Sequence, residues 1–292
     1  MMKKLSVFTT WLGCLLMGLL VSNQPALANK SPKEEPIRIV SLDGTVSEIL
    51  CDLGLQSHLI GVDVTSTYPE SLQKLPKVGH NRNISAEGVI SLKPTLVLTS
   101  VNAGTKPEVI EQIKSAGINV ITFQQEYSVA GTKKLIQDIA NTCQVTSRAK
   151  PLIKKLDADL AQVKKAVGNP KVLFIYARGT GTMMVSGRGT QVDKMIELAG
   201  GVNATSSFDN YKPLTAEALV TANPDVILLF DSGLESLGGS EGLAEVQGIA
   251  QTNAGKNGRI IVMDGHLLTG FSPRLGKALQ ELTQKISQKP KV

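Results

Sequence analysis

The chain lacks the short motifs that mark phosphate-binding, zinc-hydrolase and serine-hydrolase sites. It contains no Gly-x-x-x-x-Gly-Lys-Ser/Thr loop, no His-Glu-x-x-His motif and no Gly-x-Ser-x-Gly elbow. A glycine-rich stretch over 179–189 lacks the dinucleotide-binding spacing after a strand, so we interpret it as a turn. These absences argue against an enzyme and favour a protein that binds its ligand without turnover.

Metal-ligating side chains are also scarce. The chain has only three histidines, His58, His80 and His266, and they are scattered. Bare zinc or manganese ions need clustered ligands, so a site for such an ion is disfavoured. Outside the first 28 residues the only cysteines are Cys51 and Cys143. We interpret them as buried free thiols, although an exported protein could join them, and their spacing does not decide between the two.

Long apolar runs and one-sided charge are missing beyond the amino terminus. Lys3 and Lys4 precede an apolar run over 5–21, and Ala26-Leu27-Ala28 fits a small-residue cleavage site. This pattern predicts a cleavable signal peptide over 1–28, followed by a tether over 29–36. Later apolar runs are interrupted by charge, Gly or Pro, so we expect a soluble mature protein. The 31 basic residues are interspersed with 25 acidic ones, which does not favour nucleic-acid binding.

The remaining sequence alternates between β-branched runs and helical patterns, which predicts parallel sheets. The stretch 128–167 has no strand signal and keeps a helical leucine spacing, with a possible break near Cys143. The predicted fold is therefore α/β, with two Rossmann-like lobes joined by a long interdomain helix. Its expected parts are an N-terminal lobe over 37–127, a helical crossing over 128–168 and a C-terminal lobe over 169–292.

An internal repeat supports the two-lobe prediction. Residues 84–98 align on residues 214–228 without a gap. Each copy has an N-cap hydroxyl, Ser85 or Thr215, then a glutamate, Glu87 or Glu217, then a proline and a buried strand. We therefore expect two similar lobes with the ligand between them.

Loops at the carboxyl ends of parallel strands face the binding crevice of open α/β sheets. Because a stiff helix joins the lobes, the width of this cleft should change only modestly. The loops expected to line the cleft are 43–45, 63–68, 100–105, 177–181, 231–233 and 264–268.

Several segments resemble the helical-hinge class of periplasmic binding proteins. The class likeness lies in the strand 37–42 with Thr45-Val46-Ser47-Glu48, in Leu59-Ile60-Gly61-Val62-Asp63 and in Tyr68-Pro69. The segments Leu75-Pro76-Lys77-Val78-Gly79, Ile84-Ser85-Ala86-Glu87-Gly88 and Gly187-Arg188-Gly189-Thr190 resemble the haem-binding members. The likeness extends from about Ile37 to Leu279.

This resemblance implies a function. It describes a periplasmic, monomeric component of an ABC haem importer, with haem b as its transported ligand. Such a protein captures haem (hemin) in the interlobe cleft and delivers it to a permease dimer with its ATPase. An outer-membrane haem receptor is a possible donor.

The resemblance also implies site residues. It assigns Tyr68 as the haem iron ligand, and a phenolate suits Fe(III). Arg82 is a nearby cation that would lower the pKa of this tyrosine. The position of a distal histidine is occupied by Arg178, which alternatively pairs with a propionate. His80 and Phe271 are further pocket candidates, and His266 is a candidate for lining the cleft. The alternatives are a rim tyrosine, a surface arginine and a hydrogen-bonded loop histidine.

Glu87 and Glu217 occupy equivalent positions in the repeat, and in the class such glutamates bind arginines of the two permease subunits. The alternative is that each carboxylate only complements a helix dipole. A pair related by pseudo-two-fold symmetry suits a two-fold receptor.

Other ligands of the same class remain open, namely cobalamin and ferric siderophores. Their pockets rely on aromatics or several arginines, whereas aromatic residues make up 4% of this chain and Trp11 lies in the leader. The scarcity of aromatics favours haem. A haem-degrading or chelatase enzyme would consume haem, whereas a carrier binds it stoichiometrically.

Overall fold

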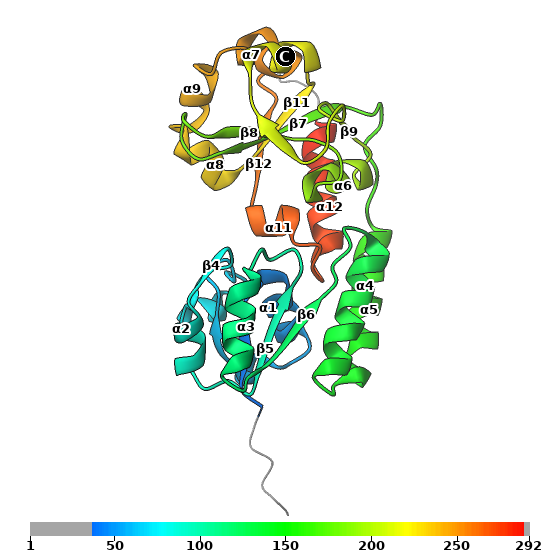
Figure 1. Ribbon diagram of the computed structural model, residues 1–292. Coiled ribbons are helices and arrows are strands. Elements are labelled where there is room, and N and C mark those ends of the chain that lie inside the picture. Colours follow the sequence, from blue (N-terminus) through cyan, green and yellow to red (C-terminus); the bar gives the residue numbers. More distant parts are fainter. Residues whose placement is uncertain (1–36, 289–292) are drawn as a thin grey trace, which may run out of the picture. The chain divides into compact units, whose positions relative to one another are not determined.

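The computed structural model describes residues 37–288, which lie in one compact unit. The signal peptide and tether predicted over 1–36 lie outside the described residues. Two sheets, each with its own helices, are connected by a pair of helices and by the C-terminal helix (Figure 1). We call residues 37–127 the N-lobe and residues 169–288 the C-lobe.

The N-lobe is built on a four-stranded parallel sheet with the order β2-β1-β5-β6. Its strands are β1 (Ile39–Ser41), β2 (Leu59–Val62), β5 (Leu96–Ser100) and β6 (Asn119–Phe123). Its helices are α1 (Gly44–Asp52), α2 (Ala86–Ser91) and α3 (Pro107–Ser115). A short hairpin, β3 (Gly79–His80) with β4 (Asn83–Ile84), follows β2.

The C-lobe sheet has the order β10-β8-β7-β11-β12, with β9 also pairing β7. Its strands are β7 (Lys171–Ala177), β8 (Met183–Ser186), β9 (Val202–Asn203), β10 (Tyr211–Pro213), β11 (Val226–Phe230) and β12 (Ile260–Met263). Strands β7, β9, β11 and β12 run parallel, as predicted, whereas β8 and β10 form an antiparallel edge. The edge forms because β7 turns back directly into β8 through residues 178–182.

The C-lobe helices lie between and after these strands. They are α6 (Gln191–Leu198), α7 (Ala216–Ala222), α8 (Asp231–Ser236), α9 (Gly239–Ala244), α10 (Asn253–Lys256), α11 (Gly265–Thr269) and α12 (Leu275–Ser287). No helix within residues 37–288 is long and apolar enough to cross a bilayer.

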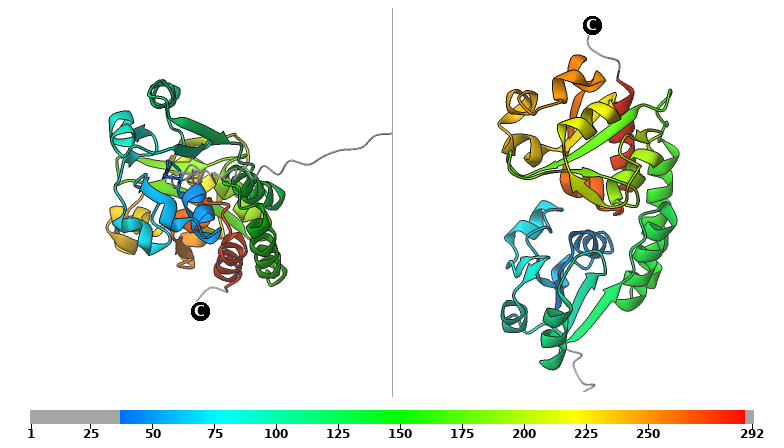
Figure 2. Two further views of the ribbon diagram at one scale, coloured as in Figure 1. Left: turned by 90° about the horizontal axis from the view of Figure 1, so that it is seen from below. Right: turned by 45° about the horizontal axis from the view of Figure 1, so that its top comes forward.

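The connection between the lobes is two helices, α4 (Val129–Thr142) and α5 (Thr146–Ala161), rather than one. They pack against each other, and the chain breaks between them at Cys143, as predicted (Figures 1 and 2). Helix α12 packs along α5, where a Cβ on Gly276 would lie 2.8 Å from the backbone carbon of Asp159. The interdomain element is therefore a layer of three helices.

Both faces of each sheet are buried. Ile39 and Val40 of β1 enter different hydrophobic clusters, and so do Leu173 and Phe174 of β7. One of these clusters runs through both lobes and the connecting helices, with members such as Leu50, Leu135, Leu156, Phe174 and Leu282. Because this core is shared, the sheets are held by packing as well as by the chain connections.

Helix starts explain much of the local structure. In both repeat copies the predicted hydroxyl caps the helix, since Ser85 accepts from the N–H of Gly88 and Thr215 from that of Ala218. Helix α1 begins with a different cap. A Thr45–Glu48 capping box fits the sequence pattern, but Asp43 is the N-cap and Glu48 is fully buried.

Candidate functional site

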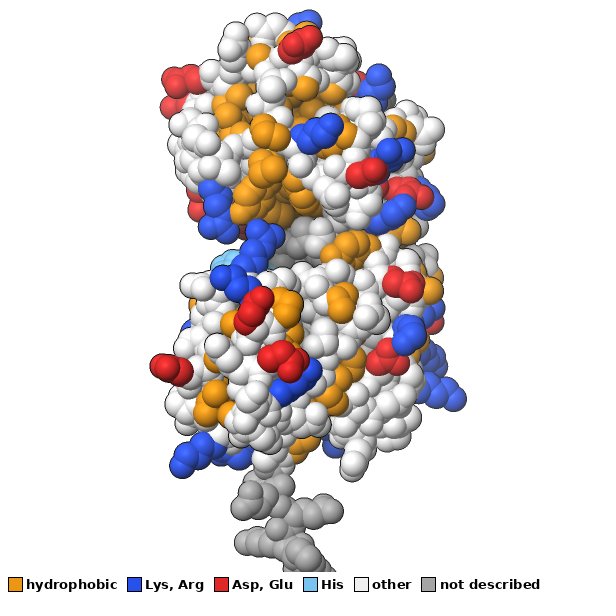
Figure 3. Space-filling model, in the orientation of Figure 1, with side chains coloured by type: hydrophobic (Ala, Val, Ile, Leu, Met, Phe, Trp, Pro, Cys, Tyr) orange, Lys and Arg blue, Asp and Glu red, His pale blue; other side chains and the backbone are white. Residues whose placement is uncertain are grey.

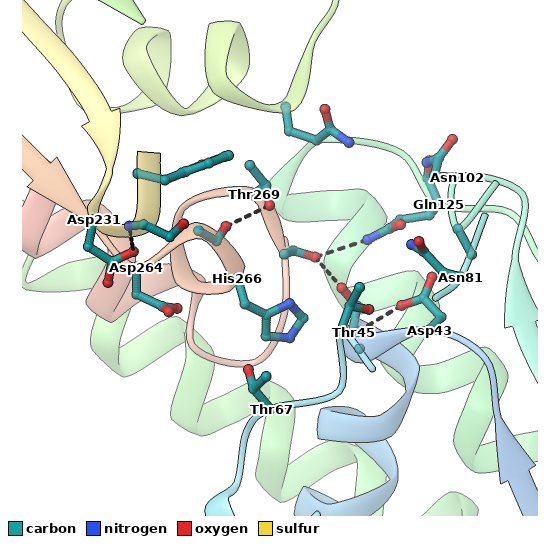
Figure 4. Close-up of a pocket in the computed structure, with 18 residues that line it drawn as sticks. Asp43, Thr45, Thr67, Asn81, Asn102, Gln125, Asp231, Asp264, His266 and Thr269 are labelled. Atoms are coloured by element: carbon teal, nitrogen blue, oxygen red, sulfur yellow. Dashed lines mark hydrogen bonds between the residues drawn. The ribbon is translucent and has the colours of Figure 1, made fainter. Parts of the chain in front are cut away.

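Two adjoining pockets form a cleft between the carboxyl ends of the two sheets. The first has a volume of about 450 Å³, and most of the residues that line it are polar. Five of the six loops predicted to line the cleft contribute to it, and Figure 4 shows their side chains. Its lining includes Asp43, Thr45, Thr65, Thr67, Asn81, Asn102, Gln125, Gln191, Asp231, Asp264, His266 and Thr269. We call it the polar pocket.

A buried network supports the N-lobe side of the polar pocket. Asp43 accepts hydrogen bonds from the N–H groups of Thr45 and Val46 and from the Ser100 hydroxyl. Burial raises the pKa of the Asp43 carboxyl above its ordinary value, against the hydrogen bond from Ser100. A second carboxylate, Asp63, accepts from Ser66 at 2.6 Å. The loops of this wall are thus fixed by their own hydrogen bonds.

The second pocket has a volume of about 390 Å³ and shares Gln191, Phe230 and Thr269 with the first. Its other lining residues are Arg82, Tyr176, Met184 and Tyr211. We call it the aromatic pocket. In the space-filling view, hydrophobic side chains gather on the C-lobe side of the hollow, with basic side chains at its edge (Figure 3). This pocket fits a flat apolar ligand that carries anionic groups.

The aromatic side chains of this pocket are fixed by neighbours. The rings of Tyr176 and Phe230 pack edge to face with centroids 6.2 Å apart. Burial raises the pKa of Tyr211, while a hydrogen bond from Ser186 and the charge of Arg82 act in the opposite direction. The hydroxyl of Tyr176 accepts a hydrogen bond from Nε of Arg178. This hydrogen bond fixes the position of the Tyr176 oxygen.

His80 lies in the β3–β4 hairpin between the two pockets. The next residue, Asn81, lines the polar pocket, and Arg82 lines the aromatic pocket. The backbone N–H of Arg82 donates to Nδ1 of the half-buried His80 at 3.3 Å. Because Nδ1 accepts this bond, a neutral ring carries its proton on Nε2 and offers that nitrogen as a donor.

Tyr68, the iron ligand predicted from the sequence, does not line either pocket, although the neighbouring Thr67 does. Its side chain is 41% exposed, and the guanidinium of Arg274 lies 3.5 Å from its ring centroid. The structure therefore places this tyrosine against Arg274, next to Thr67 at the polar pocket.

Arg274 belongs to a segment of the chain that docks on the N-lobe. Its Nε and Nη2 donate to the two carboxylate oxygens of Glu48, at 2.9 and 2.7 Å. Burial opposes the charge of Arg274, but the hydrogen bonds and charge of Glu48 outweigh burial and raise the pKa of the guanidinium. Ser272 also donates to Glu48 at 2.7 Å. The sequence analysis missed this ion pair.

Of two further residues predicted to line the cleft, the structure places one in the polar pocket and the other in the core. His266 lines the polar pocket, and its ring lies so close to Gly44 that a Cβ there would be 2.5 Å from Cε1. Phe271, by contrast, is 1% exposed and packs on Tyr127 with ring centroids 5.4 Å apart. Its place in the core is incompatible with lining the pocket, because the segment 270–273 folds inward onto α4.

The remaining predicted residues lie at the surface. Glu87 and Glu217 are exposed in the first turns of α2 and α7. Arg178 is exposed at the β7–β8 turn, with its guanidinium carbon 5.7 Å from the Tyr176 ring centroid. Cys51 and Cys143 are free and partly buried.

The sequence analysis missed most of the aromatic pocket, namely Tyr176, Met184, Gln191, Tyr211 and Phe230. Two signals could have identified part of it. Tyr176 lies two residues before Arg178, and Phe230 directly precedes a loop predicted to line the cleft.

Comparisons with known proteins agree with this architecture. A family model described as "Periplasmic binding protein" matches residues 39–267. The apo structure of the periplasmic heme-binding protein RhuT from Roseiflexus sp. RS-1 is 39% identical, with a TM-score of 0.83 over 87% of this chain and 98% of that one. The periplasmic heme-binding protein BhuT, solved in complex with two hemes, is 37% identical with a TM-score of 0.81 over 86% and 97%.

Among curated proteins, a Bacillus subtilis (strain 168) protein is 31% identical over 260 residues. These cover 87% of this chain and 81% of the relative. That relative is described as the uncharacterized ABC transporter substrate-binding lipoprotein YvrC.

Proposed function

Because the chain belongs to the periplasmic binding protein family, we propose that it captures haem b in its cleft and delivers it to an ABC permease and ATPase for import. The observation that carries this proposal is the aromatic pocket with Arg82 in its lining, in a chain similar to RhuT and BhuT. The protein acts in the periplasm as a monomeric carrier without turnover, and an outer-membrane receptor is its proposed donor.

The pocket chemistry matches the haem molecule. Haem is a flat apolar macrocycle with two carboxylates on one edge. Tyr176, Tyr211 and Phe230 offer aromatic surface to the macrocycle, and the Met184 side chain fills the space beside them. Arg82 supplies a cation for a propionate, since a guanidinium can form two parallel bonds to a carboxylate.

For the iron, we propose a tyrosine ligand, with Tyr176 as one candidate and Tyr68, the ligand predicted from the sequence, as the other. A tyrosine phenolate is an axial ligand of haem iron. Tyr176 lines the aromatic pocket and accepts a hydrogen bond from Arg178, which fixes the position of its oxygen. His80 precedes two pocket-lining residues of the opposite lobe, and we propose that it contacts the macrocycle. Arg178 is a positioning residue in this arrangement, because it acts through Tyr176.

The test is a haemin titration of the mature protein, followed by absorbance, with single variants. If Tyr176 is the ligand, Tyr176→Phe should remove the ferric phenolate band, because the iron loses its anionic oxygen. His80→Ala should weaken binding and keep the phenolate band, because this side chain contacts the macrocycle and not the iron. Arg178→Ala should weaken binding about 10–100-fold, as expected for a residue that supports a metal ligand.

Tyr68→Phe is the matched control and also tests the prediction from the sequence. If Tyr176 is the ligand, Tyr68→Phe should leave the spectrum unchanged. If Tyr68→Phe loses the phenolate band while Tyr176→Phe keeps it, Tyr68 is the ligand. If the wild-type protein gives no saturable spectrum, haem is rejected, and cobalamin and ferric siderophores are titrated next.

We further propose that Glu87 and Glu217 dock the protein on the two permease subunits. Both carboxylates are exposed at helix starts in equivalent positions of the repeat. Glu87→Gln and Glu217→Gln should each reduce haem uptake by proteoliposomes that contain the transporter, while leaving the haemin titration unchanged. Glu241→Gln, at another exposed C-lobe glutamate, is the control.

A further inference from the structure

Two carboxylates lie side by side on the C-lobe side of the polar pocket. Strands β11 and β12 are parallel, with Phe230 opposite Met263, so the next residues along each strand are also neighbours. These residues are Asp231 and Asp264, and both line the polar pocket (Figure 4). Their Cα atoms are separated by roughly the strand spacing of about 5 Å.

Neither carboxylate forms an ion pair within residues 37–288, although Asp264 lies near enough to Arg274 for its charge to help raise the pKa of that guanidinium. Oδ1 of Asp231 accepts from the N–H of Ser232, and Oδ1 of Asp264 accepts from the N–H of Leu267, each at 2.7 Å. No salt bridge in the described part of the chain includes either residue. The second oxygen of each carboxylate is left to solvent or to a ligand in the pocket.

The rest of the polar pocket does not offset this negative charge. Asp43 adds a third carboxyl group, while no lysine or arginine lines the pocket. His266 is its one basic side chain, and its Nε2 lies 3.7 Å from the buried carboxylate of Glu48. Arg82 lines the aromatic pocket instead. The cleft is thus divided into an aromatic half with cations and a polar half with carboxylates.

We infer that the cleft admits a single haem, and that Asp231 and Asp264 exclude a second one from the polar pocket. This inference rests on the proposed function. A second macrocycle there would remove water from two carboxylates without giving them hydrogen-bond donors. Its propionates would also meet charges of their own sign in a partly buried space. BhuT, at 37% identity, has been solved with two hemes, so a related chain accommodates both.

The test is the stoichiometry of haemin binding by the mature protein, from absorbance titration and native mass spectrometry. The wild type should saturate at one equivalent. The double variant Asp231→Asn, Asp264→Asn removes both charges and keeps the side-chain shape and the Oδ1 acceptors. A second equivalent of haemin should then bind. Its dissociation constant should be lower than in the wild type by about tenfold or more, because the like-charge contacts disappear.

Asp209→Asn is the control, because this exposed carboxylate pairs with Arg188 outside the two pockets, and it should keep one equivalent. Two equivalents bound by the wild type would overturn the inference while leaving the proposed function intact. No haemin bound by the wild type would instead refute the proposed function. A double variant that folds, binds the first haem normally and still rejects the second would remove these two aspartates as the cause.

Discussion

The N-lobe presents Asp43, Thr45 and Thr65 to the cleft, whereas the C-lobe presents Tyr176, Tyr211 and Phe230. Tyr176 and Phe230 lie at the carboxyl ends of the parallel strands β7 and β11, whereas Tyr211 begins the antiparallel strand β10. The polar side chains of the N-lobe wall are largely bonded to one another, so they hold the loops in place. The aromatic side chains of the C-lobe wall are partly buried and line the aromatic pocket. The difference separates N-lobe side chains that maintain the cleft from C-lobe aromatic side chains that are placed to contact the ligand.

This comparison predicts that substitutions under the N-lobe wall cost stability, with the largest effect at Glu48. Glu48→Ala leaves the guanidinium of Arg274 buried without its partner, and Arg274 is only 13% exposed. Breaking such a pair costs about 3–5 kcal/mol in the free energy of unfolding. Urea denaturation followed by circular dichroism measures the change.

Asp138→Ala is the matched control, since it breaks an exposed ion pair with Lys134 within one helix. That pair should contribute only about 0.3–0.5 kcal/mol. A second variant distinguishes the loss of the ion pair from the cost of leaving the Arg274 guanidinium buried without a partner. Replacing both Glu48 and Arg274 by apolar residues should recover much of the loss. Equal destabilisation by Glu48→Ala and Asp138→Ala would contradict the assignment of the buried pair.

The next prediction concerns the opposite wall, where substitution should weaken binding and leave stability nearly unchanged. Met184→Ala removes apolar contact with the macrocycle. Loss of about 50 Å² of such contact corresponds to about 1–1.5 kcal/mol, or up to about tenfold in the haem dissociation constant. Met184→Leu keeps the volume and should keep the affinity. Haemin titration measures the expected loss of affinity, and urea denaturation of the same samples measures stability. A Met184→Ala variant that lost stability but kept its haem affinity would contradict the comparison of the two walls.

The architecture was predictable because repeated local patterns encode it. The aligned segments 84–98 and 214–228 form the same cap, helix and strand in both lobes. The rule for carboxyl-terminal loops located five of the six loops that line the polar pocket. The antiparallel edge of the C-lobe was missed, because a short strand such as β8 has the same apolar composition in either direction.

The side-chain assignments were less predictable, because they depend on contacts between distant segments. Glu48 has the spacing of a capping box after Thr45, yet its partner is Arg274, which is 226 residues away along the chain. Phe271 follows a cleft loop, but packing on Tyr127 buries it. The position of the Tyr68 ring likewise depends on a distant residue, because the guanidinium of Arg274 packs on it. Local pattern gives the element and its ends, and tertiary packing decides where each side chain points.

The smallest predicted effect is a pH dependence at the N-lobe wall. Burial raises the folded-state pKa of Asp43 above its ordinary value of 3.8. For such a carboxyl group the stabilising contribution is fully present below the unfolded-state pKa and is lost as the pH rises through the folded-state pKa. Asp43→Asn keeps the Oδ1 acceptor that caps α1 but cannot titrate. The free energy of unfolding of the variant should therefore increase relative to that of the wild type as the pH rises.

Urea denaturation at several values between about pH 4 and about pH 7 gives the difference in unfolding free energy between wild type and Asp43→Asn. This difference should favour the wild type most at the acidic end, because the Asp43 carboxyl group is then protonated in the folded state and partly protonated in the unfolded state. The other titrating groups are common to both proteins and cancel. Asp157→Asn, at a half-exposed carboxylate, should show no such trend. If the wild type instead became more stable relative to the variant as the pH rose, the hydrogen bonds from Ser100 and the backbone would outweigh burial in setting the pKa of Asp43. The N-lobe wall would then stabilise a charged Asp43.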